Sequence, residues 1–140
     1  MNIIDLKAEH FFWIGDLVDV QRGHVITPEG AVDIEAAGGK TVINDAGDVI
    51  MIAGVYPRWD GVGLGWAWLS RKWRGHAKEI TIEMHAWLNA SGFHRIEIGV
   101  LAGFKAGERW AKRLGFTLET PMARKWGPDG RDYSIWVRVS

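Results

Sequence analysis

Hydrophobic residues in the first half of the chain occur in short runs bounded by turn-forming residues, a pattern typical of β-strands. Four such runs are expected to form strands, at residues 2–6, 41–43, 49–56 and 62–69. The second and third runs are separated by Asn-Asp-Ala-Gly-Asp at residues 44–48, which is typical of a hairpin turn. Residues 57–61 are expected to form a loop before the fourth strand. The pattern therefore predicts consecutive antiparallel strands.

Helical spacing of apolar residues predicts two helices in the same half of the chain. The first is expected over residues 10–21, where the apolar positions are Phe12, Trp13, Leu17 and Val20. The second is expected to begin at Thr27, a capping residue followed by Pro28 at the first helical position. Gly38 and Gly39 are expected to end it after Ala37.

The second half of the chain alternates between helical and strand patterns. Residues 75–90 and 105–114 each have one apolar face and one charged face, which predicts two amphipathic helices. A strand is expected between them at residues 95–101, and a closing hairpin at residues 116–122 and 133–139. A strand-helix-strand-helix-strand order requires some parallel pairing covered by helices. We expect one α/β domain over residues 1–140, with a mixed sheet of six or seven strands and four helices.

Composition narrows the range of functions. The 17 basic and 17 acidic side chains cancel, which argues against nucleic-acid binding driven mainly by counterion release. The chain has no cysteine, and its five histidines lack the spacing of a metal site, so we expect no structural metal. Its apolar runs are too short to cross a bilayer, and a cytoplasmic location is expected.

Candidate chemistry lies at residues 72–77, which read Lys-Trp-Arg-Gly-His-Ala between a predicted strand and a predicted helix. Backbone N–H groups converge at the start of a helix and favour a phosphate group there. Gly75 would let a ligand approach the backbone, while Lys72 and Arg74 add positive charge. The segment equally fits a solvated basic loop that needs a glycine to turn.

The preceding strand, residues 62–69, has one face of very small residues. Alternation places Gly63, Gly65 and Ala67 on that face, opposite Leu64, Trp66 and Trp68. Glycines inside a strand often mark the close approach of a ligand or of another part of the backbone. The small face therefore fits a ligand site, although it could equally make room for a helix.

Two motifs together resemble the GCN5-related N-acetyltransferase (GNAT) superfamily. That family's signature is a basic or polar residue, two variable positions, glycine, one variable position, and glycine or alanine, and residues 72–77 match it. Leu114-Gly115-Phe116 at the end of the second amphipathic helix resembles the family's Leu-Gly-Phe before its sixth strand. The resemblance covers about residues 41–139. Within the family, the chain resembles the short members of phage or prophage type. It implies a sheet splayed between its fourth and fifth strands.

The resemblance also implies acetyl-coenzyme A as cosubstrate and a primary amine, on a small molecule or a protein, as acceptor. Backbone N–H groups at residues 73–77 would bind the coenzyme diphosphate, and main-chain groups at residues 67–69 would pair with its pantetheine. The implied cofactor-binding residues are Ala67, Trp68, Leu69, Lys72, Trp73, Arg74, Gly75, His76, Ala77 and Phe104. His76 could also be simply an exposed residue at a helix start.

The catalytic positions depart from the family pattern. Ala111 stands where many members have a tyrosine that protonates the departing thiolate, and Phe104 stands near a common asparagine. Glu97 is the first candidate base, because a carboxylate between Ile96 and Ile98 would have apolar neighbours. A structural salt bridge would explain Glu97 equally well. The candidate acids are the two tyrosines, Tyr133 and Tyr56.

Other functions stay open at this stage. An inactive GNAT-fold protein, serving as a binding or virion-associated structural protein, would fit the missing tyrosine. A nucleic-acid binder could use the basic residues Lys105, Arg109, Lys112 and Arg113, although such a run is more often a solvated helix face. A homodimer could form through the C-terminal hairpin if Ile135 and Trp136 lie at a sheet edge.

Overall fold

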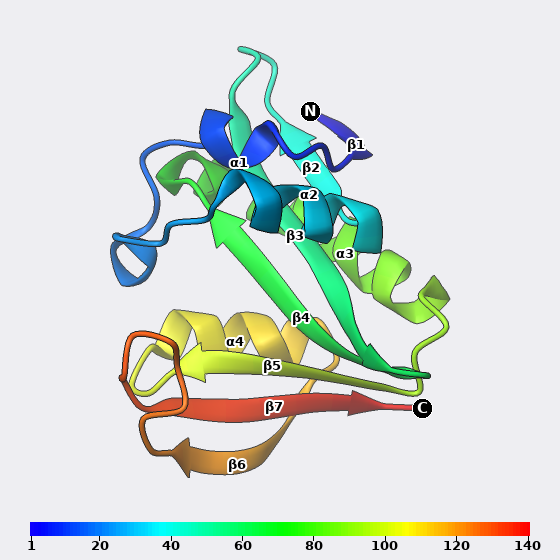
Figure 1. Ribbon diagram of the computed structural model, residues 1–140, viewed down its shortest axis with the longest axis vertical. Helices are drawn as coiled ribbons and strands as arrows, with labels where there is room; N and C mark the ends of the chain where they lie inside the picture. Colours follow the sequence, from blue (N-terminus) through cyan, green and yellow to red (C-terminus); the bar gives the residue numbers. More distant parts are fainter. The chain divides into compact units, whose positions relative to one another are not determined.

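The computed structural model describes all residues from 1 to 140 (Figure 1). The chain forms two compact units, one of residues 1–56 and 65–77 and the other of residues 57–64 and 78–140. Its helices are α1 (His10–Trp13), α2 (Pro28–Ala37), α3 (Ala77–Ala90) and α4 (Lys105–Arg113), with short 3-10 helices η1 (Asp19–Gln21) and η2 (Arg71–His76). Its strands are β1 (Asn2–Asp5), β2 (Lys40–Ile43), β3 (Val49–Trp59), β4 (Val62–Leu69), β5 (Arg95–Leu101), β6 (Thr117–Ala123) and β7 (Tyr133–Val139).

The strands follow the order β1-β2-β3-β4-β5-β7-β6 in one seven-stranded mixed sheet. The pairs β1–β2, β2–β3, β5–β7 and β6–β7 are antiparallel, and β4–β5 is parallel. The predicted α/β class, strand number and parallel pairing are therefore confirmed. The register between β4 and β5 runs from Val62 to Leu64 of β4. The predicted splay between these two strands stays a prediction, as does the single domain.

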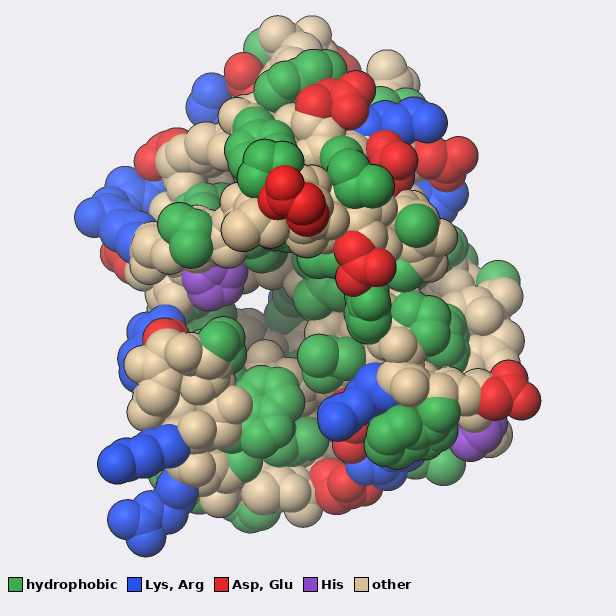
Figure 2. Space-filling model, viewed as in Figure 1, with side chains coloured by type: hydrophobic (Ala, Val, Ile, Leu, Met, Phe, Trp, Pro, Cys, Tyr) green, Lys and Arg blue, Asp and Glu red, His purple; other side chains and the backbone are tan.

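The core of the first unit joins its helices to one face of its strands. Phe11 of α1 and Ala31 of α2 are buried together with Val49 and Ile52 of β3. Trp66 of β4 packs against the same cluster. Burial of these apolar side chains is what holds α1 and α2 over the strands (Figure 1). The outer surface around these helices carries acidic and hydrophobic side chains side by side (Figure 2).

The first helix is shorter than predicted. α1 is a single turn, because the backbone of Ile14 is extended at ψ 127° and Asp16 adopts a left-handed φ of 48°. The later apolar positions of the pattern serve other contacts: Leu17 forms an antiparallel bridge with Ser70, and Val18 is buried. The prediction of a helix over residues 10–21 was therefore wrong, since tertiary pairing with β4 replaces the helical hydrogen bonds.

The second helix begins and ends as predicted. Thr27 Oγ1 accepts a hydrogen bond from the Gly30 N–H at 3.0 Å, and Pro28 takes the first helical position. Gly38 ends the helix with a φ of 92°, a conformation that favours glycine. These signals are local, which is why the sequence alone locates this helix.

The strand β3 extends beyond its predicted end. It continues through Pro57 to Trp59, and the turn to β4 is limited to Asp60 and Gly61. Gly61 has a φ of 75°, and the ring of His94 lies against it, so that a side chain there would collide with the histidine. The predicted loop over residues 57–61 was therefore wrong, because pairing in the sheet carries the strand past Pro57.

In the second unit, β7 pairs with β5 along its whole length, from Leu101 opposite Tyr133 to Arg95 opposite Val139. Helix α4 covers one face of these strands (Figure 1). Ile135 and Trp136 are 8% and 3% exposed and paired with β5, so they are not available at an edge of the sheet for a dimer. β7 is an inner strand, and the strand at this edge of the sheet is β6.

No helix of the structure combines the length and the apolar character that crossing a membrane would require.

Candidate functional site

The predicted phosphate loop is helical rather than open. Residues 71–76 form η2, which continues directly into α3. Ser70 caps this segment, since its Oγ accepts from the Lys72 N–H at 3.3 Å and its backbone oxygen accepts from the Trp73 N–H at 3.0 Å. The Ala77 N–H donates to the Arg74 oxygen. Amides that were expected to face a ligand thus already take part in local hydrogen bonds.

Gly75 lies at an open part of the surface. It is exposed, and a Cβ added to it would find no other heavy atom within 4 Å. Its φ also lies outside the left-handed range in which side chains are strained. Space rather than backbone conformation therefore distinguishes this position, and a group outside the chain can approach its main chain.

Two cations of this segment are paired with carboxylates of the first unit. Lys72 Nζ lies 2.9 Å from Asp48 Oδ2, and this hydrogen bond lowers the pKa of the Asp48 carboxyl. Arg71 lies 2.5 Å from Asp19 and 3.8 Å from Asp16, and the bond to Asp19 raises the pKa of the guanidinium. An anion binding at the segment would compete with these carboxylates for the two cations.

The main chain of β4 at residues 67–69 is hydrogen-bonded within the first unit. Ser70 donates its N–H to Ile50 of β3, so the alternate residues Ala67 and Leu69 face the opposite edge of β4. At that edge the Ala67 oxygen accepts from Gln21 Nε2 at 2.8 Å, and the Leu69 N–H donates to Gln21 Oε1 at 2.7 Å. No local pattern in the sequence points to this contact, because Gln21 is distant along the chain from residues 67–69.

The tryptophans of β4 belong to an aromatic cluster. The Phe11 ring stacks against Trp66 with centroids 5.4 Å apart and meets the edge of Trp68 at 5.1 Å. His24 lies 5.7 Å from Trp68 on the same unit. The buried Nε1 of Trp66 has no hydrogen-bond partner in the structure. The predicted large face of β4 is therefore a packing surface.

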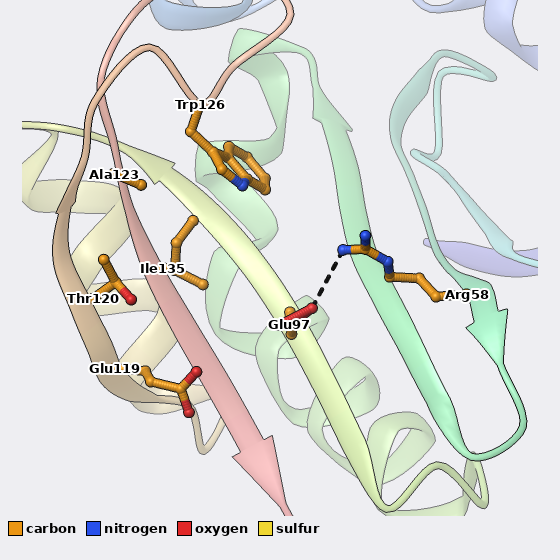
Figure 3. A pocket seen from close by; sticks show the side chains of 7 residues that line it. All are labelled: Arg58, Glu97, Glu119, Thr120, Ala123, Trp126 and Ile135. Atoms are coloured by element: carbon orange, nitrogen blue, oxygen red, sulfur yellow. Dashed lines mark hydrogen bonds and ion pairs between the residues drawn. The ribbon is translucent and has the colours of Figure 1, made fainter.

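Glu97 has charged neighbours in place of the apolar ones expected. Its carboxylate lies 3.0 Å from Arg95 and 3.5 Å from Arg58 (Figure 3). Arg95 also donates two hydrogen bonds to Glu119, at 3.0 and 2.5 Å, which lower the pKa of that carboxyl. The expected apolar surroundings were wrong, because Arg95 lies two positions before Glu97 on the same face of β5 and Arg58 reaches it from β3.

A cavity of about 260 Å³ opens beside Glu97 in the second unit. Its lining residues are Arg58, Glu97, Glu119, Thr120, Ala123, Trp126 and Ile135 (Figure 3). The Trp126 ring lies against the backbone of Gly99, two residues along β5 from Glu97. Arg58, Glu119 and Trp126 were not predicted from the sequence. The one available signal was Gly99, since a glycine inside a strand marks close approach of another group.

Tyr133 shares this face of the sheet. Its register partner is Leu101, and Glu97 and Leu101 alternate onto the same side of β5. Its ring lies 5.5 Å from Trp126, and its hydroxyl donates to Asp129 Oδ2 at 3.4 Å. Burial, with the charge of Asp129, raises the pKa of the Tyr133 hydroxyl.

The other candidate residues lie in hydrogen bonds or packing contacts within their own unit. Tyr56 lies in the first unit and donates to Asp33 at 2.6 Å, which raises the pKa of its hydroxyl. Phe104 precedes α4 without capping it by a side chain, and its ring packs against Gly107. Ala111, at the position of the family's tyrosine, is 1% exposed and buried in the second unit. No group of three or more His, Cys, Asp or Glu side chains is arranged to hold a metal ion.

Comparisons with known proteins identify the fold. A scan against protein-family models found no match, and a search of curated proteins also found none. Among solved structures, Ard1 from Thermoplasma volcanium matches with a TM-score of 0.75 and 12% identity, over 99% of this chain and 96% of that one. A GNAT superfamily phosphinothricin acetyltransferase from Sinorhizobium meliloti, solved in complex with AcCoA, matches with a TM-score of 0.73 and 18% identity, over 99% and 87%.

A third structure extends the same likeness. The ribosomal-protein-S5-alanine acetyltransferase from Vibrio fischeri matches with a TM-score of 0.70 and 16% identity, over 98% of this chain and 91% of that one. Nothing in these comparisons supports a phage origin. The identities are low, but the matches extend over nearly the whole chain, with its seven-stranded mixed sheet and parallel β4–β5 pair. The chain therefore has the fold of the GCN5-related N-acetyltransferase superfamily.

Proposed function

We propose that this protein binds acetyl-coenzyme A and transfers its acetyl group to a primary amine, in the cytoplasm. The observation that carries the proposal is the open surface at Gly75, in a segment that joins β4 to α3 in this fold. The likeness to the Sinorhizobium meliloti enzyme, which was solved with AcCoA, supports the same ligand here. A diphosphate suits a helix start, where backbone N–H groups and the helix dipole favour negative charge.

The proposed coenzyme contacts follow the segment and the strand before it. Main-chain groups from Trp73 to Ala77 would bind the diphosphate, with the Trp73 and Ala77 amides exchanging their local hydrogen bonds for phosphate oxygens. Lys72 and Arg74 would supply positive charge, and His76 would supply a hydrogen-bond donor. Main-chain groups from Ala67 to Leu69 would pair with pantetheine, and Phe104 would border the same ligand. Lys72 would exchange Asp48 for a phosphate oxygen, so the ion pair with Asp48 is a contact that binding must break.

For the transfer step, we propose Glu97 as proton acceptor and Tyr133 as proton donor. The amine nitrogen attacks the thioester carbonyl, a C–N bond forms and the C–S bond breaks. The amine proton passes to Glu97, and the coenzyme thiolate takes a proton from Tyr133. Burial raises the pKa of Tyr133, so its hydroxyl is protonated at neutral pH and is available as a donor when the C–S bond breaks.

The sheet register constrains how these two residues can act. Tyr133 pairs with Leu101, four positions along β5 from Glu97, which is about 13 Å at about 3.3 Å per residue. The attacking nitrogen and the leaving sulfur share one carbon atom and are far closer than that. Since Trp126 lies over the strand at Gly99 between them, we propose that Glu97 takes its proton through a water molecule.

The cavity beside Glu97 is the proposed acceptor site. An ammonium group can lie over the indole ring and pair with Glu97 or Glu119, in exchange for Arg95, which is bound to both carboxylates. Arg58 lies in the same cavity and opposes a cation unless Glu97 holds it aside. The acceptor is therefore proposed to be a small amine or the amine of an exposed chain end or side chain.

Burial of Ala111 favours a second function, coenzyme binding without transfer. No side chain from that position can protonate a thiolate, and a larger residue there would disturb the packing around it. In this case the fold would serve as a binding or structural module. Tyr133 is then a packing residue against Trp126 rather than an acid.

A binding measurement followed by a turnover measurement separates the two functions. Calorimetry with acetyl-coenzyme A would be followed by detection of free thiol in the presence of a panel of amines. The panel would include small diamines, amino acids and a peptide with a free N-terminus. Binding with thiol release for any amine supports the enzyme, and binding without release supports the module. Failure to bind acetyl-coenzyme A at millimolar concentration would contradict both.

A further inference from the structure

Residues 16–21 of the first unit lie along the edge of β4 that faces away from β3. We call this segment the strap. Two main-chain hydrogen bonds join it to the strand end, from the Val18 N–H to the Leu69 oxygen and from the Arg71 N–H to the Asp16 oxygen, each 2.9 Å. They flank the antiparallel bridge between Leu17 and Ser70. The strap is therefore joined to the strand end by one isolated antiparallel bridge and its two flanking hydrogen bonds.

Beyond the bridge, the side chain of Gln21 also contacts the strand. The carboxamide of Gln21 donates to the Ala67 oxygen and accepts from the Leu69 N–H, at 2.8 and 2.7 Å. A carboxamide has one acceptor oxygen and an N–H donor on a planar group, as a peptide unit has. Gln21 thus pairs with the Ala67 oxygen and the Leu69 N–H in the way that a backbone amide of a neighbouring chain would.

From this contact we infer that Gln21 occupies, in the unliganded protein, the edge of β4 that an amide-bearing ligand must take. The inference rests on the proposed function, in which the two amides of pantetheine pair with residues 67–69. The Leu69 N–H makes one strong hydrogen bond, which Gln21 Oε1 now accepts, and the Gln21 amide group lies beside the Ala67 oxygen at the same edge. A ligand can therefore pair with Ala67 and Leu69 only after the carboxamide of Gln21 has left.

Several features fit displacement of Gln21 and η1, while Leu17 and Val18 stay packed in the first unit. The strap is held to η2 by an exposed ion pair between Arg71 and Asp19, and exposed ion pairs are weak. Gln21 itself is half-buried and ends the 3-10 helix η1, which has no buried residue. Arg71 adjoins Lys72, the first residue of the proposed diphosphate segment. A phosphate that draws Arg71 from Asp19 would also loosen the strap.

Substitution of Gln21 tests the inference with coenzyme A as the probe. Gln21→Ala removes both competing hydrogen bonds, so the dissociation constant of coenzyme A measured by calorimetry is expected to fall about tenfold. Gln21→Asn has a shorter side chain that cannot reach both groups. Its dissociation constant for coenzyme A is expected to lie between those of the alanine variant and the wild type. Val25→Ala, at a residue that is 88% exposed, should bind as the wild type does.

Hydrogen exchange of the Leu69 amide supplies a readout that does not need the ligand. In the Gln21→Ala variant this amide should exchange faster than in the wild type, while amides of β3 keep their protection. Unchanged exchange at Leu69 would overturn the inference, as would coenzyme A affinities that are equal in the wild type and both Gln21 variants. Equal affinities would leave the proposed coenzyme binding intact. Absence of binding in all variants would overturn both.

Discussion

The indole ring of Trp126 lies against the backbone of Gly99, so close that a Cβ at residue 99 would collide with its six-membered ring. This contact sets one wall of the cavity beside Glu97 (Figure 3). Trp126 lies in the connection between β6 and β7, and its ring reaches Gly99 of β5. A strand glycine thus forms the floor under an aromatic side chain that is remote in sequence.

The first prediction concerns this pair. Gly99→Ala should lower the free energy of unfolding by about 1–3 kcal/mol, because the added methyl group displaces the indole ring. In a Trp126→Ala background the same change should cost less than about 0.5 kcal/mol, since the colliding ring is gone. Urea unfolding of the wild type, the two single variants and the double variant gives the coupling free energy between residues 99 and 126. Equal costs in both backgrounds would show that the clash is relieved elsewhere.

The second prediction concerns the buried His10 and the pH dependence of stability. Its Nδ1 accepts from the Lys7 N–H at 3.0 Å and lies 2.7 Å from Thr41 Oγ1, so in the folded protein Nδ1 carries no proton. Burial lowers the pKa of His10 below its ordinary value of 6.5. The unfolded chain therefore takes up a proton first as the pH falls.

It follows that the free energy of unfolding should decrease as the pH is lowered from about 7 through 6.5 toward 5. His10→Asn keeps an acceptor oxygen near the Lys7 N–H and removes the titrating group, so the variant should lose less stability over the same range. Thermal unfolding at a series of pH values measures both. Parallel curves for the two proteins would mean that other groups cause the dependence.

The third prediction concerns Glu97 and assumes that transfer is detected. Glu97→Gln should reduce kcat by about 10²–10⁴-fold, the usual contribution of a general base, with little effect on the affinity for acetyl-coenzyme A. Glu119→Gln is the matched control, because Glu119 is a second carboxylate of the same cavity and is bound to Arg95. If turnover survives in the Glu97 variant, or falls equally in both variants, Glu97 serves only its ion pairs with Arg58 and Arg95.

Local signals in the sequence were sufficient for much of the fold. The cap at Thr27 and the stop at Gly38 each depend on neighbouring residues, and the structure contains both. The prediction of the first helix failed because a contact between distant residues decides the structure there. Its apolar spacing is helical, but Val18 gains a partner in Leu69, a contact that no local pattern contains.

The candidate site shows the same division. Gly75 could be singled out from its motif, whereas the surroundings of Glu97 could not, because Arg58 and Trp126 reach it only through strand pairing and a distant connection. The hydrogen bonds of Gln21 to β4 are of the same kind. A single sequence specifies which residues alternate along a strand but not which side chain meets its edge.

Binding of acetyl-coenzyme A to a Gly75→Leu variant tests the central claim most directly. The added side chain meets no neighbouring atom, so the unliganded variant should unfold within about 0.5 kcal/mol of the wild type, as should Ala86→Leu at an exposed site on α3. At a ligand concentration of about 100 times Kd, the wild type and Ala86→Leu should gain about 2.7 kcal/mol in stability, and Gly75→Leu should gain none. Equal stabilisation of Gly75→Leu by the coenzyme would contradict a diphosphate site at the start of α3.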